Sequence, residues 1–335
     1  MKNFKASYFT RDFNFRFKAK TSRNTLTQKR SWFILLSDGH HMGIGEASPI
    51  WGLSPESESD YQEQIELVVA RPQHFLEHRE LLRHHPSIQF ALETAIKGIK
   101  GQSTFHLHTT PWTLGQQGQK INGLVWMGDK AFMVEQVKKK LEDGFTCLKL
   151  KVGSLDHDAE ISIIRAIRNE FSASSLEIRL DANGAFGAKA LGHLQDYDSY
   201  EIHSVEQPIA PGNWTQMREL CASSPIPIAL DEELIGVTGL DEQVRLLDTI
   251  KPAFLILKPS LLGGTQACDE WIDLAKERTI GWWATSMLES DLGLNAIAQW
   301  VSTHQPKLPQ GLGTGQLFDN NIPSPLNIRG EELWY

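Results

Sequence analysis

Short apolar segments with the length of β-strands recur through the second half of the chain, and amphipathic helical patterns separate them. One such helix is expected to begin at Asp129, a residue suited to an N-cap, and to end at Gly144. Alternation of this kind is typical of a parallel sheet, and roughly eight strands favour closure into a (β/α) barrel. The expected strands are Ile121–Trp126, Leu148–Val152, Leu176–Asp181, Ile202–Glu206, Pro227–Asp231, Ala253–Lys258, Ile280–Ser286 and Gln310–Gly313.

Three consecutive strands of this series end in a carboxylate. Asp181, Glu206 and Asp231 follow one another at intervals of 25 residues. An acid at the end of one strand is often the N-cap of the next helix, and that alternative applies to each residue singly. In a parallel barrel, however, the strand ends converge on one face, where three carboxylates repel one another unless a cation binds between them. Because oxygen ligands select a hard ion, the pattern predicts a Mg²⁺ site that also accepts Mn²⁺.

Lysines flank the three acids along the chain. Lys149 and Lys151 alternate within one strand, so both point to the same face, which is either a solvated edge or the barrel interior. The acids on the next strands supply counter-charge and favour the interior. Lys258 lies across the barrel, and amines on opposite sides of a bound substrate suit proton transfer at a carbon. We expect Lys151 to be the base and Lys149 to lower its proton affinity.

The first third of the chain has a different pattern. Alternating strands, a glycine-rich turn and two helical segments indicate a mixed α+β region, and a polar stretch rich in Gly and Gln marks its end. We therefore expect an α+β capping domain at 1–115, a catalytic barrel at 116–315, and a tail at 316–335 that returns to the capping domain. The segments concerned are Phe13–Phe17, Trp32–Leu36, Gly43–Pro49, Asp60–Ala70, Ile88–Ile99 and Thr109–Lys120.

Composition limits the class of protein. The chain has 335 residues, 41% of them hydrophobic and 22% charged, as in ordinary soluble proteins. A net charge of −8 argues against a nucleic-acid partner, and no apolar run is long enough to span a membrane. The three cysteines, Cys147, Cys221 and Cys268, are sparse and unpaired, and no signal peptide is evident, which predicts a cytoplasmic enzyme. The sequence carries no information on oligomeric state.

These residues together resemble a known family. The combination is similar to the muconate-lactonizing subgroup of the enolase superfamily. The resemblance implies a modified TIM barrel, (β/α)₇β, with an α+β N-terminal capping domain. It carries metal-ligand roles over to Asp181, Glu206 and Asp231, and it makes Asn183 and Glu232 the residues that orient these ligands. The motifs concerned are Gly43-Ile44-Gly45-Glu46, Lys149-Leu150-Lys151, Asp181-Ala182-Asn183, Glu206-Gln207-Pro208, Asp231-Glu232 and Leu257-Lys258-Pro259.

Within this subgroup the chain is most similar to the o-succinylbenzoate synthase family of menaquinone biosynthesis. That resemblance implies syn-dehydration of 2-succinyl-6-hydroxy-2,4-cyclohexadiene-1-carboxylate, a small carboxylate substrate. The residue matching Lys151 removes the α-proton, and the residue matching Lys258 stabilises the enolate by a cation–π contact. The supporting motifs are Thr21-Ser22-Arg23, Ile121–Gly128, Ser286–Ser290, Gly311–Gly315 and Asn320-Asn321.

Contacts to the rest of the substrate are expected from loops after the last two barrel strands, which often bind anions through backbone N–H groups. Ser286, Gly313 and Thr314 are the candidates for the succinyl carboxylate, with Arg23 from a loop of the capping domain. A plain tight turn is the alternative explanation for the glycines. The loops at 22–27 and 46–53 are expected to close the pocket.

Other activities remain open at this stage. An N-acylamino acid racemase or a dipeptide epimerase would use the same metal and lysines, although Gly313-Thr314-Gly315 stands where an epimerase is expected to carry an Asp-x-Asp pair. A Schiff-base aldolase with Lys258 as nucleophile, or a binding barrel without catalysis, are the further alternatives. His106 and His108 lack a third ligand nearby and are expected to be structural.

Overall fold

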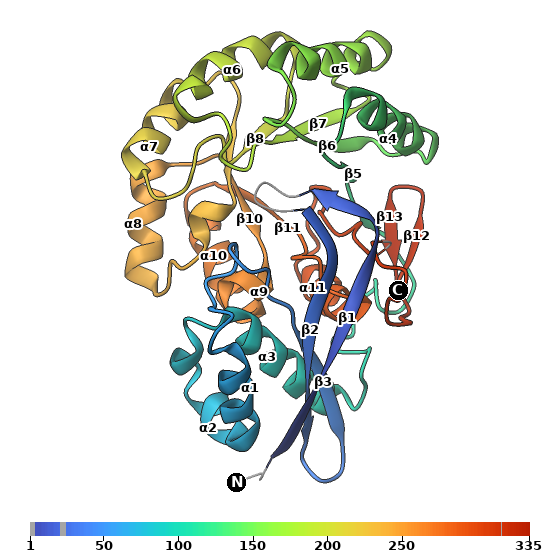
Figure 1. The fold of residues 1–335 in the computed structure, drawn as a ribbon, viewed down its shortest axis with the longest axis vertical. Coiled ribbons are helices and arrows are strands. Elements are labelled where there is room, and N and C mark those ends of the chain that lie inside the picture. The colour runs from blue at the N-terminus through green and yellow to red at the C-terminus, as the bar shows by residue number, and fades with distance from the viewer. Residues whose placement is uncertain (1–3, 21–24, 316) are drawn as a thin grey trace.

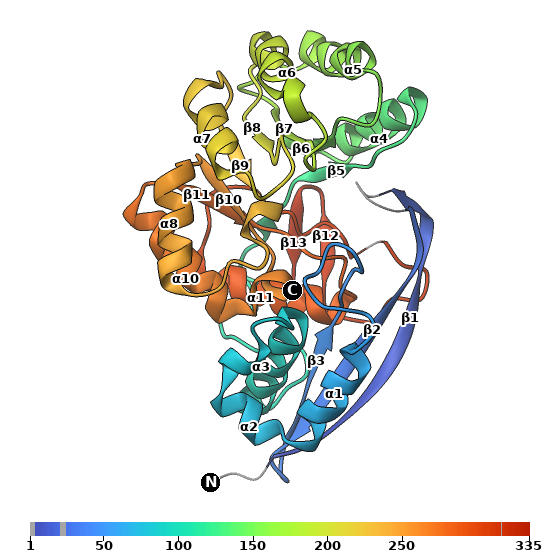
Figure 2. The same ribbon diagram turned by 60° about the vertical axis from the view of Figure 1, so that its left-hand side comes forward.

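The computed structural model describes residues 4–20, 25–315 and 317–335, which form an N-terminal cap and a parallel barrel (Figure 1). The cap has an antiparallel sheet in the order β1-β2-β3, with helices packed on one side of it (Figure 2). The strands and helices expected in this region all form, but residues 43–47 of the expected glycine-rich turn are a strand. The elements are β1 (Lys5–Lys20), β2 (Thr25–Ser37), β3 (Met42–Ala47), α1 (Tyr61–Ala70), α2 (Pro72–Glu77), η1 (Arg79–Leu82) and α3 (Pro86–Gly101).

The glycine-rich motif before Pro49 lets β3 lie directly against α3. A Cβ atom built on Gly43 would lie 1.9 Å from the carbonyl oxygen of Ala95, and one on Gly45 would lie 1.8 Å from that of Ala91. Both distances are impossible for a real side chain, so the contact requires glycine at the two positions. The next residue, Glu46, is thereby held at the boundary between the cap and the barrel.

Seven strand–helix units build the barrel of the described chain. The parallel strands run in the order β11-β10-β9-β8-β7-β6-β5, and helices α4–α8 form an arc along their outer side (Figure 1). The strands are β5 (Gly123–Val125), β6 (Cys147–Lys151), β7 (Glu177–Asp181), β8 (Ser204–Glu206), β9 (Ile228–Leu230), β10 (Phe254–Leu257) and β11 (Gly281–Ala284). The main helices are α4 (Lys130–Glu142), α5 (His157–Glu170), α6 (Ala190–Tyr197), α7 (Trp214–Ser223), α8 (Leu240–Ile250), α9 (Pro259–Leu262), α10 (Thr265–Glu277) and α11 (Asp291–His304).

The eighth strand is shorter than expected. Gln310 and Gly311 make only isolated parallel bridges, to Ile121 and Thr285, and residues 313–315 turn away. The side chain of Gln310 replaces further strand pairing, because its Oε1 accepts the N–H of Ala284 at 2.8 Å. Two residues thus close the sheet into the modified (β/α)₇β barrel that the sequence predicted.

The tail contacts both parts of the molecule. Phe318 packs on Phe13 and Phe15 of β1, with ring centroids 5.1 and 4.8 Å apart. Farther on, β12 (Asn327–Arg329) and β13 (Glu332–Trp334) form a hairpin that pairs with β4 (Gln119–Lys120) beside the barrel. The division at residues 115 and 316 remains our proposal for the domain boundaries. None of the described helices combines the length and apolar character needed to cross a bilayer.

Candidate active site

The carboxyl ends of the central barrel strands bring the lysines and acids together. Lys149 and Lys151 lie on β6, and the pleat directs both side chains inward. The Nζ atom of Lys149 is 2.9 Å from Oδ2 of Asp181 and also donates to Oε2 of Glu206. The Nζ atom of Lys151 lies 2.9 Å from the same Oδ2 of Asp181. The two ammonium groups are therefore paired with the acids on the next two strands.

The three acids form a compact cluster of potential metal ligands. One carboxylate oxygen from each of Asp181, Glu206 and Asp231 lies within 4.8 Å of the other two, and all three side chains are buried. The Oε1 atom of Glu206 is buried and has no hydrogen-bond partner among the described residues. A buried carboxylate oxygen without a donor is costly, and a hard cation would satisfy it. The cluster thus fits a divalent metal ion.

Burial and charge act in opposite directions on these groups. Burial disfavours ionisation of Asp181, but the Lys149 and Lys151 ammonium groups outweigh it and hold its pKa below the usual range. Burial raises the pKa of Glu206, and the neighbouring carboxylates of Asp181 and Asp231 add to that rise against the effect of Lys149. The ionised form of Glu206 is thus disfavoured in the absence of a cation, and a cation bound between the three acids would favour it.

Lys258 stands on the other side of the cluster. It follows β10, with β7, β8 and β9 between it and the strand of Lys149 and Lys151. Its Nζ atom lies 2.6 Å from Oδ2 of Asp231. Burial lowers the pKa of Lys258, but the charge of Asp231 reverses this and raises it. A protonated amine suits charge stabilisation better than attack on a carbonyl, which argues against the aldolase alternative.

Asn183 and Glu232 connect the two sides of the site. Asn183 Nδ2 donates to Oε1 of Glu232 at 2.9 Å, and Asn183 Oδ1 accepts from Nζ of Lys151 at 2.7 Å. The backbone of Asn183 has a φ of 43°, a left-handed conformation that asparagine tolerates better than most residues. In this conformation the side-chain amide of Asn183 contacts both Lys151 and Glu232.

Three of the residues expected to contact the substrate line a cavity that also contains Lys149, Lys151, Lys258 and Asp181. Ser286, Gly313 and Thr314 are all in its wall, and the hydroxyl groups of Ser286 and Thr314 are hydrogen bonded to each other. From the cap, Ile50 and Leu53 line the cavity, as expected for the loop at 46–53. Arg23 lies outside the described residues, as do Thr21, Ser22 and Asn24. Gly313 belongs to a turn, in agreement with the simpler alternative for that glycine.

Several wall residues were not predicted from the sequence. Asn122, Leu124 and Trp126 line the cavity from the first barrel strand, where alternate residues share a face. Met287 and Leu288 line it from the loop after β11. The period-two pattern of the first strand could have identified the former group. Met287 and Leu288 lie within the motif Ser286–Ser290, but their apolar side chains did not indicate a place in the cavity wall.

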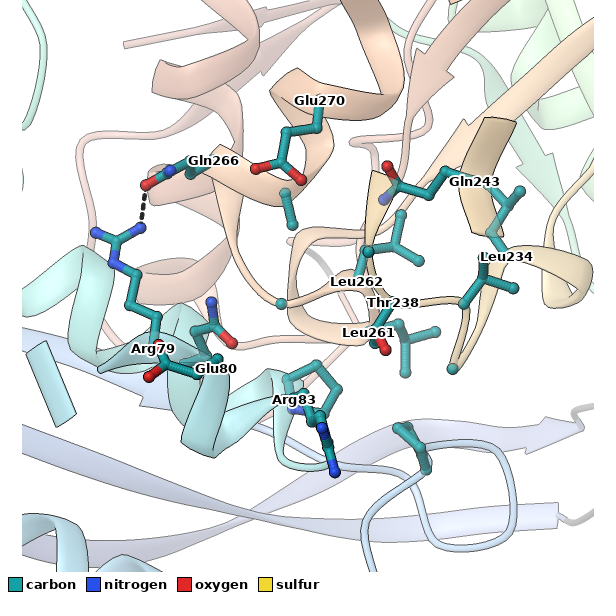
Figure 3. A pocket seen from close by; sticks show the side chains of 18 residues that line it. Arg79, Glu80, Arg83, Leu234, Thr238, Gln243, Leu261, Leu262, Gln266 and Glu270 are labelled. Carbon is teal, nitrogen blue, oxygen red and sulfur yellow. Dashed lines mark hydrogen bonds between the residues drawn. The ribbon is translucent and has the colours of Figure 1, made fainter. Parts of the chain in front are cut away.

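A larger cavity of about 420 Å³ lies elsewhere, between η1 of the cap and helices α8–α10 (Figure 3). Arg79 and Gln266 face each other across its edge and are hydrogen bonded. None of the acids or lysines described above lines this cavity, whereas the smaller one, about 100 Å³, contains Lys149, Lys151, Lys258 and Asp181. Because the smaller cavity contains these lysines and Asp181, it is the candidate active site.

A buried carboxylate triad between lysines, in a (β/α)₇β barrel closed by a cap, defines the enolase class of proteins. Residues 132–333 match the family model Enolase C-terminal domain-like, and residues 16–99 match the model MenC, N-terminal domain. An o-succinylbenzoate synthase of Desulfotalea psychrophila is 42% identical over 98% of both chains. The chain therefore belongs to the o-succinylbenzoate synthase family of the enolase superfamily.

Solved structures agree with this assignment. The crystal structure of MenC from Desulfotalea psychrophila superimposes with a TM-score of 0.88 and 40% identity, and 99% of each chain is covered. The L-Ala-D/L-Glu epimerase from Bacillus subtilis reaches a TM-score of 0.85 at 20% identity, covering 100% of this chain and 96% of its own. The second likeness shows a shared fold only.

Proposed function

We propose that this protein is a hydro-lyase that forms o-succinylbenzoate by syn-dehydration of 2-succinyl-6-hydroxy-2,4-cyclohexadiene-1-carboxylate, as a step of menaquinone biosynthesis. The observation that carries the proposal is the pairing of two lysines on β6 with a buried acid triad, in a chain 42% identical over its full length to an o-succinylbenzoate synthase. The substrate is a small carboxylate.

Lys151 is the proposed base. Its amine takes the α-proton, the electrons of the C–H bond form the new ring double bond, and the C–O bond to the hydroxyl group breaks. The same lysine returns the proton to the departing hydroxyl, which leaves as water, so that elimination occurs on one face. Asn183, which accepts from Lys151 at 2.7 Å, keeps the Nζ atom directed toward the cavity.

Lys149 and Lys258 complete the proposed set of catalytic lysines. Lys149 is buried and paired with Asp181 and Glu206, so it stays charged and places a second positive charge beside Lys151. Lys258, separated from the strand of Lys151 by three strands of the sheet, meets the opposite side of the substrate with its ammonium group. Negative charge that develops when the proton leaves is thus flanked by cations on both faces.

Asp181, Glu206 and Asp231 are the proposed ligands of Mg²⁺, with Mn²⁺ as a substitute. When bound there, the ion would supply a Lewis acid for the substrate carboxylate. Asn183 and Glu232 would orient the ligand set from outside, since Asn183 also donates its backbone N–H to Oδ1 of Asp181 at 3.1 Å. Ser286, Thr314, Gly313 and Arg23 are the proposed contacts of the succinyl carboxylate.

An assay of the purified protein tests the proposal. The cyclohexadiene substrate is offered with Mg²⁺ and with EDTA, beside panels of dipeptides and N-succinylamino acids. We expect Mg²⁺-dependent formation of o-succinylbenzoate at a kcat/KM far above that for any epimerisation. Preferential epimerisation of dipeptides would instead establish the alternative function, which the turn at residues 313–315, without acidic side chains, disfavours.

A further inference from the structure

A buried lysine of the cap binds the loop that follows the last full barrel strand. Lys29 lies on β2, and its side chain points toward the barrel together with Ser31, while Arg30 between them is exposed. The Nζ atom of Lys29 donates to the carbonyl oxygens of Met287 and Leu288, the latter at 3.1 Å. Only 6% of Lys29 is exposed, so its ammonium group needs hydrogen-bond partners within the protein.

Carboxylates bind backbone N–H groups of the same loop. Glu289 Oε2 accepts the N–H of Met287 at 2.6 Å, and its Oε1 accepts from the hydroxyl of Ser260, two residues after Lys258. Glu46 of the cap accepts the N–H of Ser290 at 2.9 Å. Charged side chains thus bind four backbone groups of this short segment, and two of these side chains, Lys29 and Glu46, come from the cap.

The loop conformation needs such support. Leu288 has a φ of 58°, a left-handed conformation that is unfavourable for leucine. In this conformation the carbonyl oxygens of Met287 and Leu288 are directed to Lys29. Ser286, Met287 and Leu288 also line the active-site cavity. A released loop would bring acceptor oxygens toward that cavity, where they would repel an anionic substrate group.

We propose that Lys29 is a positioning residue for substrate binding: it turns two carbonyl dipoles away from the cavity and places a positive charge behind the loop that receives the succinyl carboxylate. This inference rests on the proposed function. Lys29 contacts neither the acids nor the catalytic lysines in the described hydrogen bonds, so its influence falls on binding more than on proton transfer.

Steady-state kinetics of Lys29→Met test the proposal, with exposed Lys189→Met as the matched control for loss of one lysine charge. We expect KM for the cyclohexadiene substrate to rise about tenfold in Lys29→Met while kcat changes less than threefold, and the Mg²⁺ activation constant to stay unchanged. Lys29→Gln, which keeps a donor without the charge, should have an intermediate KM. An unchanged KM in both variants, or a fall in kcat alone, would overturn the proposal.

A double-mutant cycle with Ser286→Ala separates positioning from general stability. If Lys29 acts through the loop, the increases in KM of Lys29→Met and Ser286→Ala will be less than multiplicative in the double variant. Multiplicative effects would show that Lys29 acts elsewhere. Wild-type turnover is measured in the same series, so inactivity of the wild type counts against the proposed function, and a normal wild type with an unaltered Lys29 variant counts against this inference alone.

Discussion

The Nζ atom of Lys151 lies 2.7 Å from Oδ1 of Asn183, whose backbone is left-handed. The contact joins the proposed base to an amide that also binds Glu232 and, through its backbone, Asp181. Asn183 thus contacts the proposed base with its side chain and one proposed metal ligand, Asp181, with its backbone. A substitution at Asn183 can therefore perturb Lys151 and Asp181 while both residues themselves stay unchanged.

Asn183→Asp should shift the pH dependence of the reaction. A carboxylate at this position favours the ammonium form of Lys151 and repels Glu232, so the acidic limb of kcat/KM should move to higher pH by about one unit. Activity at the new plateau should return to within about tenfold of the wild type. The check is a pH profile of both proteins at saturating Mg²⁺; an unshifted limb would show that Asn183 does not govern the base.

Lys151→Ala should abolish product formation, because no other amine occupies its place on β6. The loss should exceed about a thousandfold in kcat, while the circular dichroism spectrum and Mg²⁺ affinity stay close to those of the wild type. Calorimetry with Mg²⁺ supplies the second measurement. Near-normal turnover of the variant would remove Lys151 from the role of base.

Metal removal should inactivate the enzyme reversibly. EDTA should eliminate turnover, and added Mg²⁺ or Mn²⁺ should restore it, because three carboxylates supply the site. Glu206→Gln should weaken Mg²⁺ binding by at least tenfold and leave the protein folded. Titration of activity against free Mg²⁺ measures both effects, and full activity in EDTA is the contrary outcome.

Lys29 should give the folding stability a distinct pH dependence. Burial lowers its pKa from 10.5 to about 8, against the opposing effect of Glu289. Between these values the unfolded chain holds a proton that the folded protein has lost, so this group makes stability rise with pH across that window and contributes no slope below pH 8. The total is about 3 kcal/mol for a shift of this size. Urea unfolding of wild type and Lys29→Met from pH 7 to 10.5 measures it, and parallel curves would refute it.

The sequence was sufficient for the barrel and the charged centre because both follow from local pattern. Acids and lysines at the ends of regularly spaced parallel strands come together when the sheet closes. For this reason Asp181, Glu206 and Lys258 could be placed together from the sequence. The eighth strand could not be bounded, since a side chain, that of Gln310, replaces part of its pairing. The role of Lys29 was not predicted, because its partners are backbone carbonyl oxygens. Every residue has such an oxygen, so the sequence does not show which of them a lysine binds.

The closure of the barrel by Gln310 and Gly311 has a consequence for how the protein is made. The bridge from Gln310 reaches back to Ile121, and Phe318 reaches back to Phe15 of β1. During synthesis on the ribosome, the first barrel strand and the first cap strand can therefore form their last contacts only when nearly the whole chain has been made. Such non-local pairing slows folding, and the barrel around the acid cluster can close only after synthesis has passed residue 311. The proposed metal site is therefore enclosed only late in synthesis.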